Sequence, residues 1–430
     1  MSISAARFAA LWILILVAPF ARATIYYIAP PPSGDDGNPG TLAEPWATLQ
    51  HAADSVGPGD TVEVRAGNYV GGYFTTSGTA DQPIVLEAYP GESPAITVDN
   101  PTTPDGINLE GASYMTVQGF TVNGRTRTGI RAVLCQHVTI RNNSMDQNGE
   151  WGVLTGFCDD LLIENNVASR SVDQHGIYVG NSGDRPVIRG NVIWGNNANG
   201  IHMNGDISQG GDGIISGALV EANIIYDNGL AGGSGINCDG VQDSLIRNNL
   251  IYDEHASGIS LYQIDGGGPS TGDSVLNNTV LIASDGRWAL NIQDGAANAI
   301  ARNNILWNDH SFRGSLSISV DSLPGFSDNN NAVMDRFTTD GGDTILTLAQ
   351  WQMQTGLDTL AFLATPDELF VDAVGNDYEL SASSPALDTG ETRADVPTDI
   401  VGVARPQGSG YDVGAYERPA GDEIFADGFD

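Results

Sequence analysis

The chain contains no lysine. Among its 430 residues, 53 are acidic and 18 are basic, all 18 of them arginine, so the formal net charge is -35. A surface this acidic repels phosphate backbones and anionic headgroups, which argues against nucleic acid and anionic lipid as partners. Neutral ligands and divalent cations remain compatible with it. Chemistry that needs a lysine side chain is excluded.

Long apolar runs are missing beyond the N-terminus. There, one basic residue, Arg7, precedes the run FAALWILILVAPF and the small-residue motif ARA, Ala21 to Ala23. This pattern predicts a secretory signal peptide over residues 1–23 that is cleaved after Ala23, with an uncleaved anchor as the alternative. The run is short for a membrane span. We therefore expect no stable membrane insertion, and a secreted or cell-surface protein. The tail RPAGDEIFADGFD resembles the short C-terminal segments of some Gram-negative secreted proteins, and this resemblance implies a Gram-negative bacterial type.

Cysteine is also scarce. Cys135, Cys158 and Cys238 are too few for a disulfide scaffold and lack metal-site spacing, so we expect small, partly buried side chains with at most one disulfide. No compact D-x-D-x-D loop is present. The sequence assigns no cofactor with certainty and leaves calcium open.

What the chain has in abundance is an internal repeat. The dipeptide Gly-Ile or Gly-Val recurs at intervals of 23, 23, 24, 24, 35 and 23 residues. Its glycines are Gly106, Gly129, Gly152, Gly176, Gly200, Gly235 and Gly258. Between copies, a short apolar strand, a polar break ending in asparagine and a second apolar strand recur, as in TIRNNSM, LIENNVA and LIRNNLI.

Units of two or three short strands with polar turns cannot bury an apolar face alone, but they form a continuous core when stacked about 4.8 Å apart. The repeat therefore predicts a parallel β-solenoid. Each break asparagine suits a left-handed turn residue whose amide bonds to its neighbours above and below. These structural asparagines are Asn143, Asn166, Asn191, Asn223, Asn249, Asn278 and Asn304.

The repeat resembles that of the secreted right-handed parallel β-helix proteins, a superfamily that includes pectate, alginate and chondroitin lyases. The opening stretch, YYIAPPPSGDDGNPG to VRAGNY, is similar to the entry segment of that superfamily, with a cap helix expected at about Thr48 to Ser55. The segments SPALDTG and RPQGSGYDVGAYE resemble its closing segment. The resemblance implies an all-β, right-handed parallel β-helix and does not identify a reaction.

Four segments are predicted on this basis. They are a signal peptide at residues 1–23, a β-helix at 24–331, a C-terminal wrap at 332–417 that contains the helix-like LTLAQWQMQTG, and an acidic tail at 418–430.

Alternation within the Gly-Ile strand predicts which side chains face the core. The inward row is Leu109, Ala132, Thr155, Val179, Met203, Cys238, Leu261 and Ile292. One outward row is Asn108, Arg131, Leu154, Tyr178, His202, Asn237, Ser260 and Asn291, and the next contains Glu110, Val133, Gly156, Gly180, Asn204, Asp239, Tyr262 and Gln293.

The middle of these outward rows is the candidate site. Tyr178, His202 and Asp239 are the predicted catalytic residues, and because adjacent coils bring side chains within roughly 5 Å, His202 and Asp239 are expected to meet. The predicted substrate-binding residues are Arg131, Trp151, His175, Asn204, Asn237 and Tyr262. Extra residues follow Tyr178, Asn204 and Tyr262, and such loops wall a groove along one face of a solenoid.

A groove of aromatic, amide and imidazole groups suits an extended polysaccharide. A histidine base oriented by a carboxylate, with tyrosine protonating the leaving oxygen, suffices for β-elimination on a uronate polymer. Several β-helix lyase families use a lysine or arginine base with aspartate-bound calcium, and the lysine version cannot operate here. Arg131 and Arg185 are the candidates to pair with a substrate carboxylate.

Polysaccharide-lyase-like action by a monomer is the function that we expect. A non-catalytic polysaccharide-binding or surface structural role is the main alternative. Hydrolysis by two carboxylates among Asp206, Asp212, Asp239 and Asp265 is the third.

Overall fold

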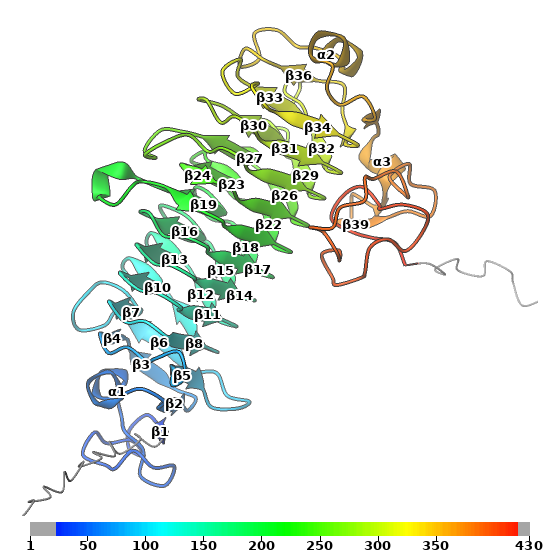
Figure 1. Ribbon diagram of the computed structural model, residues 1–430. Helices are drawn as coiled ribbons and strands as arrows, with labels where there is room; N and C mark the ends of the chain where they lie inside the picture. The colour runs from blue at the N-terminus through cyan, green and yellow to red at the C-terminus, as the bar shows by residue number, and fades with distance from the viewer. Residues whose placement is uncertain (1–22, 420–430) are drawn as a thin grey trace, which may run out of the picture.

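The computed structural model describes residues 23–419 and consists of three parallel sheets wound into one solenoid (Figure 1). Residues 1–22 of the predicted signal peptide and 420–430 of the predicted tail lie outside the described part. Each coil contributes one strand to each sheet, which we call sheets A, B and C. The expected all-β right-handed parallel β-helix is confirmed.

Sheet A has 12 strands. They are β1 (Ile25–Ile28), β2 (Thr61–Val64), β5 (Ile84–Ala88), β8 (Met115–Gln118), β11 (Thr139–Arg141), β14 (Leu162–Glu164), β17 (Val187–Arg189), β21 (Leu219–Glu221), β25 (Leu245–Arg247), β28 (Ser274–Leu276), β31 (Ile300–Arg302) and β34 (Ser327–Asn329).

Sheet B also has 12 strands. They are β3 (Asn68–Val70), β6 (Ala95–Val98), β9 (Thr121–Asn123), β12 (Ser144–Asp146), β15 (Val167–Ser169), β18 (Val192–Trp194), β22 (Ile224–Tyr226), β26 (Leu250–Glu254), β29 (Thr279–Ile282), β32 (Ile305–Asn308), β35 (Ala332–Val333) and β37 (Phe362–Leu363).

Sheet C has 11 strands and bears the candidate site. They are β4 (Gly72–Phe74), β7 (Ile107–Glu110), β10 (Thr128–Val133), β13 (Trp151–Gly156), β16 (Ile177–Gly180), β19 (Ile201–Asn204), β23 (Ser234–Asp239), β27 (Ser257–Tyr262), β30 (Leu290–Ile292), β33 (Leu316–Ile318) and β36 (Phe337–Thr338).

Short elements close the ends and edges. Helix α1 (Leu49–Ser55) begins after Thr48, whose side chain caps it, as expected for the entry segment. Helix α2 (Leu348–Thr355) covers the opposite end and buries Trp351 (Figure 1). The remaining elements are a 3-10 turn η1 (Ile207–Gln209), the pair β20 (Ile215–Ser216) and β24 (Val241–Gln242), helix α3 (Pro366–Leu369), and the antiparallel pair β38 (Phe370–Asp372) and β39 (Asp377–Leu380).

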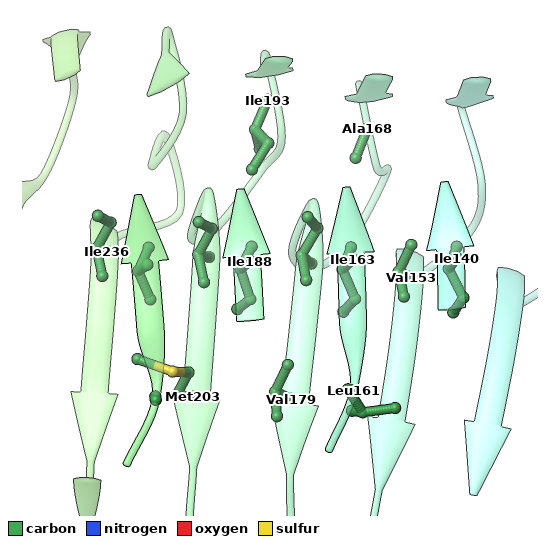
Figure 2. Close-up of a cluster of buried hydrophobic side chains, with 14 of the residues drawn as sticks. Ile140, Val153, Leu161, Ile163, Ala168, Val179, Ile188, Ile193, Met203 and Ile236 are labelled. Atoms are coloured by element: carbon green, nitrogen blue, oxygen red, sulfur yellow. The ribbon is translucent and has the colours of Figure 1, made fainter. Parts of the chain in front are cut away.

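The core is a column of aliphatic side chains enclosed by the three sheets. Figure 2 shows Val153, Val179 and Met203 of sheet C directed into the same interior as Ile163 and Ile188 of sheet A. All eight residues of the predicted inward row are buried. Branched side chains stacked in register suit this interior because they pack well on a pleated surface.

The asparagine ladder runs through the turn between sheets A and B. From Asn143 to Asn304, each Nδ2 donates to the Oδ1 of the next asparagine at 2.9–3.1 Å, and the ladder ends on Asn331. The bonding was predicted, but the left-handed conformation belongs to the residue before, for example Asn142 (φ 54°) and Asn248 (φ 52°). The ladder asparagines point their amides inward while their neighbours make the turn.

The structure shows where the solenoid ends and where the C-terminal segment packs. Strands β35, β36 and β37 extend the sheets past residue 331, the end predicted for the solenoid. Residues after β37 pack beside sheets A and B, where Arg302 of β31 binds Glu391 and Asn277 donates to the carbonyl of Asp412. The outward face of sheet C is therefore bordered by the loops that follow its own strands and not by these C-terminal residues.

Cys135 and Cys158 form a disulfide between adjacent coils, while Cys238 is buried and free. The single pairing agrees with the sequence expectation.

Candidate functional site

The outward face of sheet C carries the predicted rows in the predicted register. Tyr178 pairs with His202, His202 with Asn237, and Asn237 with Ser260. In the neighbouring row, Asn204 pairs with Asp239 and Asp239 with Tyr262. Periodicity alone therefore located the strip formed by these two rows.

His202 takes His175 as its partner. Its Nδ1 lies 3.1 Å from Nε2 of His175, and the two rings meet edge to face with centroids 4.8 Å apart. Tyr178 lies against both imidazoles, at 5.6 Å from the ring of His175 and 5.2 Å from that of His202. Two strands and the loop before β16 thus assemble a histidine pair under a tyrosine.

The hydrogen bonds of the pair fix its protons. The backbone N–H of Asn199 donates to Nδ1 of His175 at 3.2 Å, so that nitrogen carries a lone pair. In a neutral ring the proton then sits on Nε2 of His175 and is donated to Nδ1 of His202. His202 therefore carries its own proton on Nε2, which is buried and has no hydrogen-bond partner.

Burial keeps both rings neutral. It lowers the pKa of His202 to about 4, and burial together with the neighbouring imidazole lowers the pKa of His175 well below its usual value. In this arrangement His202 offers a neutral N–H donor, whereas the sequence predicted a general base.

Tyr178 is a protonated phenol at neutral pH. Burial raises its pKa to about 12, with Asp206, Asp265 and Asp239 adding to the increase and the amide of Asn204 opposing it. The hydroxyl can therefore donate a proton or a hydrogen bond. Tyr178 has the protonation state that its predicted role as an acid requires.

Asp239 does not reach His202 through a hydrogen bond. Its Oδ1 accepts the backbone N–H groups of Ile264 and Gly266 at 2.9 and 3.0 Å, and its Oδ2 accepts that of Asp265 at 2.8 Å. The carboxylate holds the loop after β27 over the strip. The predicted hydrogen bond between Asp239 and His202 is thus not formed, because Asp239 binds backbone N–H groups of this loop.

This bonding also bears on calcium. Both oxygens of Asp239 are occupied by backbone donors, and Asp206 accepts from Ser208. Within residues 23–419, no three His, Cys, Asp or Glu side chains gather as a metal ion would need. The aspartates of the strip therefore do not fit a calcium ion.

The two arginines considered for substrate carboxylates are already neutralised. Arg131 forms an ion pair with Glu110 and donates to Asn108, and Arg185 binds Asp160 at 2.7 Å. Trp151 lies on the N-terminal side of the strip, its ring 5.9 Å from that of Tyr178 and its Nε1 without a partner.

Loops wall the strip as expected. Ser182, after β16, accepts the N–H of Gly213 at 2.7 Å from the long insertion after β19. Gly267, after β27, donates to the carbonyl of Gly213 at 2.7 Å. The three insertions are bonded to each other, and the longest extends away from the solenoid beside β19 (Figure 1).

A cavity of about 400 Å³ opens at the C-terminal end of the strip. Asn237 and Tyr262, joined by a 2.8 Å hydrogen bond, belong to it, and Ser234 bonds to Ser260 at its edge. The predicted outward rows contained Asn291 and Gln293 without assigning them to the site, and sequence reasoning missed its other principal members, namely Arg287, Trp288, Asp294, Arg313 and Ser317. The weak repeat WALNI at Trp288 was the available signal for the members next to β30.

The aligned outward residues Asn237, Ser260, Asn291 and Ser317 form the floor of this cavity. They are all small and polar, which suits hydrogen bonds to hydroxyl groups.

Two family models match the chain. The right-handed β-helix region of Pel9A-like proteins matches residues 26–184, and a general right-handed β-helix region matches residues 151–330. A pectate lyase, PEL9 of Emericella nidulans, is 35% identical over 101 residues, which cover 23% of this chain and 24% of that protein. The Bacillus subtilis protein YwoF is 24% identical over 53% of this chain and 56% of its own length. The chain thus spans about a quarter and about half of these two relatives.

Solved structures share the fold. Pectate lyase Pel9A aligns with a TM-score of 0.57 at 18% identity, covering 93% of this chain and 98% of that one. A rhamnogalacturonan lyase aligns with a TM-score of 0.53 at 15% identity, covering 89% and 99%. At these identities the likeness supports the architecture alone. No helix within residues 23–419 has the length and apolar character of a membrane span.

Proposed function

Because the chain belongs to the right-handed β-helix proteins of the pectate- and alginate-lyase-like superfamily, we propose that it is a secreted enzyme that cleaves an acidic polysaccharide by β-elimination. The observation that carries the proposal is the polar strip of sheet C, which continues in register from Tyr178 and His202 into the cavity floored by Asn237 and Ser260. An extended chain of sugars can follow such a strip from coil to coil.

In the proposed reaction, a base removes the proton on C5 of a uronate, the C4–O bond breaks, and a C4=C5 double bond forms. The departing oxygen takes a proton from the hydroxyl of Tyr178. In this proposal the substrate settles against His202 so that its buried N–H, which has no partner in the described chain, donates to the substrate carboxylate, because neutralising that group makes the C5 proton more acidic.

In this proposal the base comes from the loop over the strip. Asp265 is exposed, and its Oδ2 lies 3.5 Å from Nδ2 of Asn204, beside Tyr178. Asp206, the other nearby loop carboxylate, is engaged by the backbone and hydroxyl of Ser208. We therefore assign the base to Asp265.

A product screen tests the proposal. Purified protein is incubated with pectate, alginate and glycosaminoglycans while the absorbance of unsaturated uronates is followed. We expect absorbance to rise with one of these polymers and to be lost in Tyr178→Phe and Asp265→Asn. Release of reducing ends without unsaturated products would replace elimination by hydrolysis.

Binding without turnover is the second candidate, and the protonation of His202 is the observation that favours it. The nitrogen expected to act as a base carries a proton and is buried. Saturable binding of a polysaccharide, with neither unsaturated ends nor new reducing ends formed, would establish this function in place of the lyase.

A further inference from the structure

Most arginines of the described chain are neutralised by a neighbouring carboxylate. Ion pairs hold Arg65, Arg125, Arg127, Arg131, Arg170, Arg185, Arg189, Arg247, Arg302, Arg393 and Arg405. This is the expected outcome for a chain with 18 basic and 53 acidic residues. An arginine without such a partner is therefore an exception.

Outside this set, Arg287 and Arg313 line the cavity of sheet C, whereas Arg141 lies on β11 of sheet A and donates to Gln118. Arg287 lines this cavity and is exposed, and within residues 23–419 its guanidinium makes no hydrogen bond or ion pair. Arg313 also lines it, with Nη1 donating to the carbonyl of Gly286 at 2.8 Å. Arg336, beside Arg313, donates to the carbonyl of His310 at 2.6 Å. Carbonyls orient these last two side chains without cancelling their charge.

The backbone places the guanidinium of Arg287 over the strip. Its N–H donates to the carbonyl of Ala256 at 2.8 Å, and its own carbonyl accepts from Nδ2 of Asn308. A Cβ added to Gly232, in the loop before β23, would lie 3.5 Å from Nη2 of Arg287. The side chain therefore reaches across from the loop before β30 to the loop before β23.

Arg313 and Arg336 act together on this side of the cavity. After burial, their charges lower the pKa of His310, and the carboxylate of Asp285 opposes them. Among the residues of the described chain that line the cavity, Asp294 is the one carboxylate. It follows Gln293 just after β30, whereas Arg287 lies before β30, so the two charges are at opposite ends of that strand. An anion near Arg287 would thus meet two guanidinium groups of the lining.

We propose that Arg287 binds the carboxylate of an acidic sugar whose ring lies over Asn237, Ser260 and Asn291. The planar fork of a guanidinium matches a carboxylate with two parallel hydrogen bonds. The amide and hydroxyl groups of the floor are suited to the sugar hydroxyls. This subsite rests on the proposed function, since it requires a polysaccharide in the groove.

Calorimetric titration tests the subsite. The ligands are short oligomers of galacturonate, glucuronate, mannuronate and guluronate, and for each a carboxyl-reduced, neutral counterpart. The proteins are wild type, Arg287→Gln and Arg287→Lys. Arg189→Gln is the matched control, because Arg189 is a partly exposed arginine paired with Glu164 on sheet A. A simultaneous absorbance record reports any cleavage during the titration.

We expect wild-type protein to bind one oligouronate more tightly than its neutral counterpart. Arg287→Gln should lose about 10- to 100-fold in affinity for the acidic ligand, while Arg287→Lys loses less because it keeps the charge without the fork. Neutral counterparts should bind all variants alike, and Arg189→Gln should match wild type. Unchanged thermal unfolding of Arg287→Gln would show that folding is intact.

The failures are distinguishable. Equal affinity of wild type and Arg287→Gln for the acidic ligand would overturn the subsite and leave the proposed function standing. Equal affinity of wild type for acidic and neutral ligands would overturn the carboxylate as the recognised group. Absence of binding to every oligosaccharide would overturn the subsite and the proposed function together.

Discussion

The asparagine ladder and the strip of sheet C are both stacks of polar side chains, one per coil, but they differ in how completely they are hydrogen-bonded. In the ladder, the Nδ2 of Asn191 donates both to the carbonyl of Ile163 and to the next rung. In the strip, Nε2 of His202 has no partner, and Arg287 beyond it is unpaired. A buried polar group without a partner costs free energy, so its persistence marks a place where a ligand can supply the missing bond.

Breaking the ladder should have the largest effect. In Asn223→Ala, the backbone N–H and the Nδ2 of Asn191 lose their common acceptor. The carbonyl of Ile188 and the Oδ1 of Asn249 lose their donor. Several buried groups lose partners, so we expect the free energy of unfolding to fall by about 4–6 kcal/mol. Denaturant unfolding followed by circular dichroism measures it. In the matched strip variant, Asn291→Ala, the loss should stay below about 1 kcal/mol; similar losses would remove the distinction between the stacks.

A shorter stack of buried side chains should respond to pH. Nδ2 of Asn196 donates to Asn228, and Nδ2 of Asn228 donates to Oε1 of Glu254, whose Oε2 has no partner in the described chain. Burial raises the pKa of Glu254 to about 8. An acid with a raised folded-state pKa contributes stability that is fully present below about pH 4.5 and lost as pH rises toward 8. Between pH 5 and 8 this loss is about 3 kcal/mol.

Glu254→Gln should therefore flatten the decline in stability between pH 5 and 8. Thermal unfolding across that range provides the measurement, with the exposed Glu44→Gln as control. A decline as steep as in wild type would mean that Glu254 is not the group responsible.

Whether Nε2 of His202 carries a proton decides whether this side chain acts as a hydrogen-bond donor or as a base. If its N–H binds substrate, His202→Ala should weaken binding of an acidic oligosaccharide about 10-fold, because a hydrogen bond to a charged group is lost. His202→Gln, which keeps a donor, should remain closer to wild type. Equal loss of turnover in both variants, with binding retained, would point to a base. Nitrogen NMR of the ring should show a neutral imidazole with its proton on Nε2 down to about pH 4, below which Nδ1 also gains a proton.

The smallest effect is expected at the surface pairs of sheet A. Arg189→Gln breaks a partly exposed ion pair with Glu164 at 2.6 Å, and such pairs contribute about 0–1 kcal/mol. Stability and ligand affinity should both stay within that range. A loss of affinity comparable to that of Arg287→Gln would indicate that overall charge, and not the position of one guanidinium, governs binding.

The sequence predicted what depends on register and missed what depends on side-chain direction. The recurring Gly-Ile dipeptide assigns Tyr178, His202 and Asn237 to one row because parallel coils align their Cα atoms. The same repeat says nothing of rotamers, so it did not reveal that His202 turns toward His175 or that Asp239 binds three backbone N–H groups. Arg287 was missed because it lies in a loop outside the strands, where the repeat is weakest.

The regular pairing of sheet C also makes the length of the groove adjustable in whole steps. Each strand adds one row to the floor, about 4.8 Å further along the axis, and the rows on either side keep their own neighbours. Inserting a complete coil between β27 and β30 would lengthen the floor between Ser260 and Asn291 by that step without rebuilding either end. Such a protein could change the size of the saccharide it accommodates by duplicating a coil, while the chemistry around His202 stays in place.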